Sequence, residues 1–114
     1  MGVFVISRRS NGDFQFNLKS GNGQIVLTSQ GYSSKTSCEN GIESVRLNSR
    51  EETKFEFRIA SNGKFYFILK AANGQVIGTS EMYDSESTLR GAIGSVKIAA
   101  QDAIVKDMSL AVSA

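Results

Sequence analysis

Residues 10–19 read SNGDFQFNLK, and residues 61–70 read SNGKFYFILK. In both stretches an Asn-Gly pair precedes a segment in which apolar and polar side chains alternate, which is the period of a strand with one buried face. The same offset aligns the chain with itself without a gap from Ser10/Ser61 to Ser49/Ala100. A repeat of this length indicates two copies of one structural unit.

Identical residues recur at the predicted turns and strand ends of both copies. They include Asn22-Gly23-Gln24 with Asn73-Gly74-Gln75, Thr28-Ser29 with Thr79-Ser80, and Tyr32 with Tyr83. Where the copies differ, most pairs keep size and polarity, as Ile25 and Val76 do. The repeat therefore preserves one shape twice.

Each unit is predicted to begin with a three-stranded meander, in the first copy at about 3–8, 13–19 and 24–28. Asn-Gly pairs at 11–12 and 22–23 flank the middle strand. An Asn-Gly pair supplies both positive-φ residues of a tight hairpin turn. We therefore expect the three strands to pair antiparallel.

A helix is predicted after each meander. Ser34 and Ser85 can cap its first turn, and apolar residues at spacings of four and three then share one face. These residues are Cys38, Ile42 and Val45 in the first copy and Leu89, Ile93 and Val96 in the second. Gly41 lies beside this stripe, where glycine costs about 1 kcal/mol relative to alanine, which predicts a close approach of the helix to the sheet.

A further strand is expected after each helix, at 53–59 and 103–106, and the first of these should end one unit and begin the next. The predicted fold is α+β: a tandem repeat of a β-β-β-α-β unit that forms a single, mostly antiparallel sheet with both helices on one face and pseudo-two-fold symmetry. Residues 1–114 form one domain of two repeats, about 1–51 and 52–107, and 108–114 are expected to fray.

The sequence resembles the YegP-like family. The resemblance rests on Asn22-Gly23-Gln24-Ile25-Val26, on Tyr32, on the segment from Cys38 to Val45, and on the second-copy counterparts through Val96. It implies units of three strands, a helix and a further strand, with the terminal strands exchanged between units in one sheet. It also implies small bacterial proteins without an assigned activity, so no catalytic or binding residue carries over. The second helix departs from the pattern at 91–94, where GAIG replaces NGIE.

Composition excludes several kinds of protein. The 13 basic and 11 acidic residues give a net charge of +2, far from the strongly basic surface of a dedicated nucleic-acid binder. The single cysteine, Cys38, cannot form an internal disulfide, and without histidine no zinc or other metal site is expected. These features predict a cytoplasmic monomer without a cofactor. No membrane contact is expected, because the apolar run at 3–6 is too short to span a bilayer.

Catalysis finds little support. Cys38 lies on the apolar helix stripe, its counterpart is Leu89, and the chain has no histidine to activate a thiol. The acidic pairs at 51–52 and at 84 and 86 lie near helix ends, where acids are ordinary. The Gly-containing turns lack the lysine and helix start of a phosphate-binding loop. We therefore predict a protein that is not an enzyme.

Five repeated polar residues of the first copy offer two interpretations: Lys19, Gln24, Thr28, Ser29 and Tyr32. With their counterparts they could line two related pockets. Alternatively, Ser29 and Tyr32 satisfy the connection from strand to helix, with the tyrosine ring buried. The second interpretation is favoured.

The sharpest difference between the copies lies on the outer face of the strand at 65–70. Tyr66 and Ile68 replace polar residues of the first copy, with Arg58 and Lys70 expected nearby. Exposed apolar residues on a sheet are typical of a protein contact, so a non-enzymatic protein-interaction module that uses this face or a sheet edge is the favoured hypothesis. The alternative is an accessory nucleic-acid-binding protein that stacks single strands on the same face.

Overall fold

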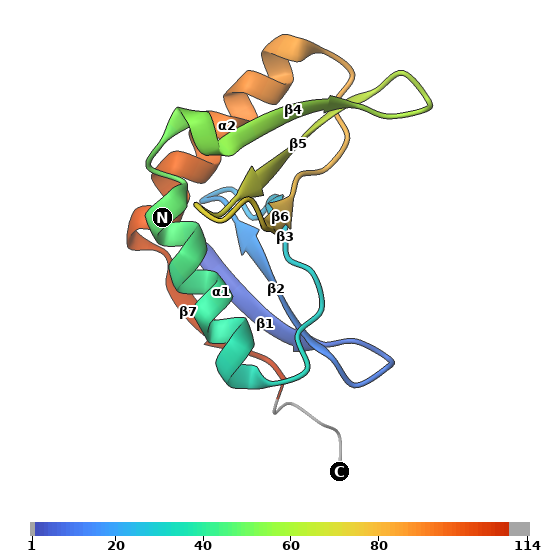
Figure 1. Ribbon diagram of the computed structural model, residues 1–114. Coiled ribbons are helices and arrows are strands. Elements are labelled where there is room, and N and C mark those ends of the chain that lie inside the picture. Colours follow the sequence, from blue (N-terminus) through green and yellow to red (C-terminus); the bar gives the residue numbers. More distant parts are fainter. Residues whose placement is uncertain (1, 110–114) are drawn as a thin grey trace.

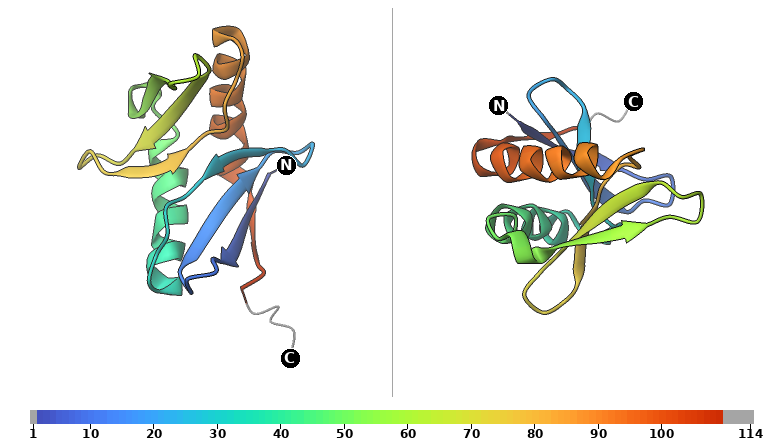
Figure 2. Two further views of the ribbon diagram at one scale, coloured as in Figure 1. Left: turned by 90° about the vertical axis from the view of Figure 1, so that its right-hand side faces the viewer. Right: turned by 90° about the horizontal axis from the view of Figure 1, so that it is seen from above.

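The computed structural model describes residues 2–109. The elements are β1 (Val3–Arg8), β2 (Phe14–Lys19), β3 (Ile25–Thr28), α1 (Lys35–Asn48), a short 3-10 turn (Glu52–Lys54), β4 (Phe55–Ile59), β5 (Phe65–Lys70), β6 (Val76–Thr79), α2 (Glu86–Asp102) and β7 (Ile104–Asp107). The seven strands form one sheet in the order β4-β5-β6-β3-β2-β1-β7, with both helices on one side of it (Figures 1 and 2). The predicted α+β fold is confirmed.

Strand exchange between the units is carried out by β7. This strand follows α2 of the second unit and crosses back to the first unit, where it pairs parallel with β1. All other neighbouring strands pair antiparallel. The segment after α1 instead becomes β4, which pairs with β5 as β1 pairs with β2. Seven strands therefore result, because β4 serves only as the first strand of the second unit.

The hairpin turns differ from the prediction. Only the glycine of each Asn-Gly pair has a positive φ, and it lies between 83° and 91° in all four turns. In the first turn the Gly12 N–H donates to the Arg9 carbonyl, and the Asn11 side chain accepts from the Asp13 N–H. This is a type I turn followed by a glycine bulge. The side-chain bond of Asn11 stabilises its ordinary right-handed conformation, so the expectation of two positive-φ residues was wrong.

The helices begin where the sequence predicts. The hydroxyl of Ser34 accepts from the Ser37 N–H, and that of Ser85 accepts from the Thr88 N–H. Their apolar stripes pack on the sheet and join the largest fully buried side chains of the strands in one core. Each helix contacts strands of both units, so the helices hold the two halves of the sheet together. No helix within residues 2–109 is long and apolar enough to cross a membrane.

Gly41 marks the closest approach of α1 to the sheet. A β-carbon at this position would collide with the hydroxyl of Tyr32, and it would lie 2.8 Å from the ring carbon that carries this hydroxyl. The Tyr32 ring in turn stacks on Phe16, with the ring centroids 6.4 Å apart. The predicted reason for glycine in this helix is therefore confirmed.

The first two residues of the segment expected to fray are held in place. The Met108 N–H donates to the Ile6 carbonyl, and Ser109 is buried and donates to the Asp107 carboxylate. Residues 110–114 lie outside the described part of the chain.

Candidate functional site

The outer-face residues named from the sequence do share one side of the sheet. Arg58 lies directly opposite Tyr66 in the β4–β5 pairing, and Ile68 lies opposite Glu56. Lys70 follows Ile68 by two residues, so its side chain leaves the strand on the same side. The structure thus brings Arg58, Tyr66, Ile68 and Lys70 together on one face.

These four side chains do not form an open apolar and basic face. Ile68 is only 6% exposed, and Tyr66 is half-buried. Arg58 and Lys70 both bind the carboxylate of Glu56, the latter at 2.9 Å. The bonds from Lys70 and then from Arg58 lower the pKa of Glu56, so the two cations are neutralised by an acid that the sequence reasoning did not consider. Ile68 lies directly opposite Glu56, on the same face as these paired charges.

Cys38 is fully buried. Burial, followed by the charges of Glu39 and Asp107, raises the pKa of its thiol to about 11. The thiol therefore remains protonated at neutral pH, whereas nucleophilic cysteines act as thiolates. The prediction of a core cysteine agrees with this position.

The repeated polar residues divide between different positions: Ser29 and Ser80 lie at the connection from strand to helix, and only Gln24, Tyr32 and their counterparts line hollows. The Ser29 hydroxyl accepts from the Phe16 N–H and donates to the Gln30 carbonyl, and Ser80 repeats both bonds with Phe67 and Glu81. These two serines therefore connect strand to helix structurally.

Two related hollows do exist, each lined by residues of both units. A hollow of about 430 Å³ places Gln24 beside Tyr83, and one of about 390 Å³ places Tyr32 near Gln75. Both are lined mainly by uncharged residues, and the first also holds Glu81 beside Tyr83, where burial, followed by the charge of Glu81, raises the pKa of Tyr83.

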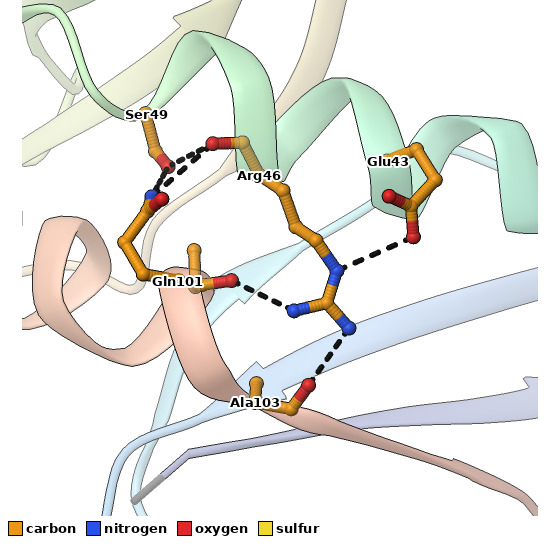
Figure 3. A network of polar contacts seen from close by, with 6 residues as sticks. Glu43, Arg46, Ser49, Gln101 and Ala103 are labelled. Carbon is orange, nitrogen blue, oxygen red and sulfur yellow. Dashed lines mark hydrogen bonds and ion pairs between the residues drawn. The ribbon is translucent and has the colours of Figure 1, made fainter.

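Arg46 organises the polar network where α2 gives way to β7 (Figure 3). Its guanidinium donates to the carbonyls of Ala100 and Ala103, at 3.0 and 2.7 Å, and binds Glu43 at 3.3 Å. It also lies 5.0 Å above the Phe4 ring. Since each of the three guanidinium nitrogens donates to one of these partners, Arg46 anchors the end of α2.

An ion pair fixes the other end of β7. Asp107 binds Lys35 of α1 at 2.7 Å. The bond from Lys35, followed by the bond from Ser109, lowers the pKa of Asp107 to about 2. The pair therefore ties the exchanged strand to the first helix.

Because of the ion pair between Lys35 and Asp107, we expect the free energy of unfolding to fall at acid pH. Because the pKa of Asp107 is depressed in the folded state, its contribution is complete above the unfolded value near 4 and is lost as the pH falls towards 2. Urea unfolding midpoints measured between pH 5 and pH 2 should drop more steeply for the natural protein than for Lys35→Met, which lacks the pair. Parallel profiles for the two proteins would contradict this assignment.

The two ends of the sheet differ in what covers them. At one end β7 pairs with β1, and Ile6 of β1 has no exposed surface. At the other end β4 has no further neighbour in the described sheet, and Phe57, which holds the position of Ile6 in the repeat, is 42% exposed. Figure 1 shows β4 along the outer edge, beside α2.

A groove of about 280 Å³ follows this open edge between β4 and α2. Its apolar lining consists of Phe55, Phe57, Leu89 and Ile93, and its polar rim of Glu52, Glu86 and Arg90. At the corresponding position in the first unit, Val105 of β7 lies beside α1 and lines a depression of about 220 Å³ with Ile42 and Glu43. No pattern noted in the sequence predicted this groove. The available signal was that one strand cannot both close the first unit and open the second.

Comparison with known proteins agrees with the duplicated architecture. The family described as "Domain of unknown function (DUF1508)" matches the chain twice, at residues 10–56 and 60–107. The UPF0339 protein YegP of Escherichia coli K12 is 52% identical over 106 residues, which cover 93% of this chain and 96% of that protein. The UPF0339 protein PA0329 of Pseudomonas aeruginosa is 46% identical with the same coverage.

Two solved structures share the fold. The solution NMR structure of a protein of unknown function, yegP from E. coli, superposes with a TM-score of 0.91 at 50% identity and covers 96% of this chain and 94% of that one. The solution NMR structure of UPF0339 protein SO3888 from Shewanella oneidensis gives a TM-score of 0.90 at 45% identity, with 96% and 92% covered. The chain therefore belongs to the DUF1508 family, in the form that carries two tandem copies of the domain and includes the YegP proteins.

Proposed function

We propose that this protein is a non-enzymatic protein-interaction module, and that its binding site is the β4 edge together with the groove between β4 and α2. The observation that carries the proposal is the 42% exposure of Phe57, because its counterpart Ile6, on the strand that pairs with β7, has no exposed surface. An exposed sheet edge offers unpaired backbone donors and acceptors, and extended peptides bind such edges by adding a strand.

The choice of this edge over the outer face follows from the side chains on each. The outer face has a buried Ile68, and its two cations are paired with Glu56. The same pairing disfavours the alternative of single-stranded nucleic acid, whose backbone requires free cations. The β4 edge instead combines an apolar groove with a strand whose outer side has no neighbour in the described sheet.

The chemistry of the chain supports a binding role rather than a catalytic one. The only cysteine is buried with its pKa raised to about 11, and the chain has no histidine. We also propose a cytoplasmic location, because a lone buried thiol suits a reducing compartment.

The test is retention of partner proteins from a nuclease-treated lysate of the source organism on immobilised protein. Phe57→Lys should abolish retention because it places a charge in the groove, whereas Tyr66→Ser on the outer face should leave it unchanged. Thermal unfolding of both variants would establish that they are folded. Retention lost only with Tyr66→Ser would move the site to the outer face, and retention lost on nuclease treatment would favour the nucleic-acid alternative.

A further inference from the structure

The exchanged strand β7 shows what a binding partner of this kind of edge looks like. It runs parallel to β1, with Val105 beside Phe4 and Asp107 beside Ile6. Neighbouring residues of paired strands point to the same face, so Val105 and Asp107 face the helices. The main chains are joined where the Met108 N–H donates to the Ile6 carbonyl.

The five residues of β4 repeat the pairing geometry of residues 4–8 of β1. Phe57 pairs with Phe67 as Ile6 pairs with Phe16, and the remaining pairs follow the same offset. The carbonyl of Phe57 therefore points away from β5, towards the free edge of the sheet, just as the carbonyl of Ile6 points towards β7. A second parallel strand can bind β4 in the register that β7 uses on β1.

The charges at the end of this edge are reversed between the units. In the first unit Asp107 of β7 binds Lys35 at 2.7 Å. The residue at the position of Lys35 in the second unit is Glu86, which lines the groove and is more than half exposed. Its present partner is Arg90 at 2.8 Å, whose side chain is 74% exposed, and exposed pairs of this kind are weak. A basic residue of an incoming strand can therefore compete for Glu86.

We infer that the segment bound at the β4 edge is an extended stretch of a partner protein that runs parallel to β4, places a β-branched side chain in the groove beside Phe55, and carries a lysine or arginine that pairs with Glu86. The inference rests on the proposed function and adds the direction, the register and the charge of the partner segment. The template for all three is β7 on β1.

The test uses two capped peptides based on β7. One has the sequence of residues 103–109, AIVKDMS, and the other, AIVKKMS, carries lysine at the position of Asp107. We expect the lysine peptide to bind about tenfold more tightly by calorimetry and to shift backbone amides of β4 and α2 in NMR spectra. Glu86→Lys should reverse the preference.

Direction is read from a spin label on the peptide N-terminus. A parallel strand places the label beside Phe55, so signals there should broaden more than those near Ile59. As a control, a lysine peptide with alternate backbone nitrogens methylated should bind at least tenfold more weakly, because its side chains are retained but strand pairing is blocked.

Several outcomes would overturn the inference: stronger broadening near Ile59, an unchanged preference in Glu86→Lys, no binding at β4, or shifts confined to β1 and α1 through exchange with β7. Sedimentation experiments test whether a second copy of the protein binds at this edge instead. A concentration-dependent dimer that dissociates in Phe57→Lys would overturn the inference in favour of that second copy. The lysate experiment tests the proposed function separately. A partner could still be retained through Phe57 even if the peptide experiments show that the bound segment is not parallel or not basic.

Discussion

Exchanging the side chains of Leu27 and Gly78 is expected to restore most of the stability that either single substitution removes. These residues occupy equivalent positions in the repeat. They lie on β3 and β6, the strands that join the two halves of the sheet through the pair Thr28 and Thr79. The two copies cannot both carry a large side chain at this junction, because the Leu27 side chain occupies the space beside Gly78. A β-carbon on Gly78 would lie 2.6 Å from the Leu27 side chain.

The single substitutions should be costly for opposite reasons. Gly78→Leu overpacks the core against a completely buried Leu27 and should cost about 3 kcal/mol or more. Leu27→Gly leaves a cavity and a flexible strand residue and should cost about 3–6 kcal/mol. The double variant moves the large side chain to the other strand and should regain at least about 2 kcal/mol relative to the sum of the singles. Urea unfolding of the four proteins measures this coupling, and additive losses would refute a shared space.

Replacing Arg46 by methionine should destabilise the protein by about 3 kcal/mol and release β7 first. Methionine keeps the aliphatic stem but removes the guanidinium over Phe4 and its bonds to the carbonyls of Ala100 and Ala103, and hydrogen bonds from charged groups contribute about 1.5–3 kcal/mol. Amide hydrogen exchange should show a larger loss of protection in β7 than in β4. Arg46→Lys should recover only part of the loss, since an ammonium group lacks the planar geometry that reaches both carbonyls.

The matched control for Arg46 is its counterpart in the second helix. Lys97 forms one ion pair at 3.0 Å with Glu52, whose side chain is 69% exposed. Exposed pairs contribute less than about 1 kcal/mol, so Lys97→Met should change the unfolding midpoint little. Equal losses for the two substitutions, or unchanged exchange in β7, would mean that Arg46 does not anchor the strand.

The asymmetry of the molecule follows from tandem fusion of the repeat. In a fully symmetric pair, each unit would send its last strand to the first strand of the other. The second unit does so with β7. The first unit cannot, because its chain passes within a few residues from α1 into β4, which is already paired with β5. The open edge is thus a consequence of the covalent connection, and it is the feature on which both proposals depend.

The local architecture could be predicted from sequence patterns alone. The strands with their alternation, the serine caps, the apolar helix stripes and the reason for Gly41 could all be predicted, because each depends on neighbours within a few residues or on one repeated pattern. The family could be recognised for the same reason, since its motifs are short and occur twice.

The surfaces that are available for binding could not be predicted in this way. The alternation of β5 predicts that Ile68 is exposed, yet it is buried. Glu56 lies opposite Ile68 on β4 and forms ion pairs with Arg58 and Lys70 on the same face. Phe57 reads as a core residue by the same rule, yet it is 42% exposed, and β4 has no further neighbour within the described sheet. Exposure at a sheet depends on which strand ends the sheet and on the partners that long side chains find. Both are set by contacts between residues distant in the chain, which a local pattern does not contain.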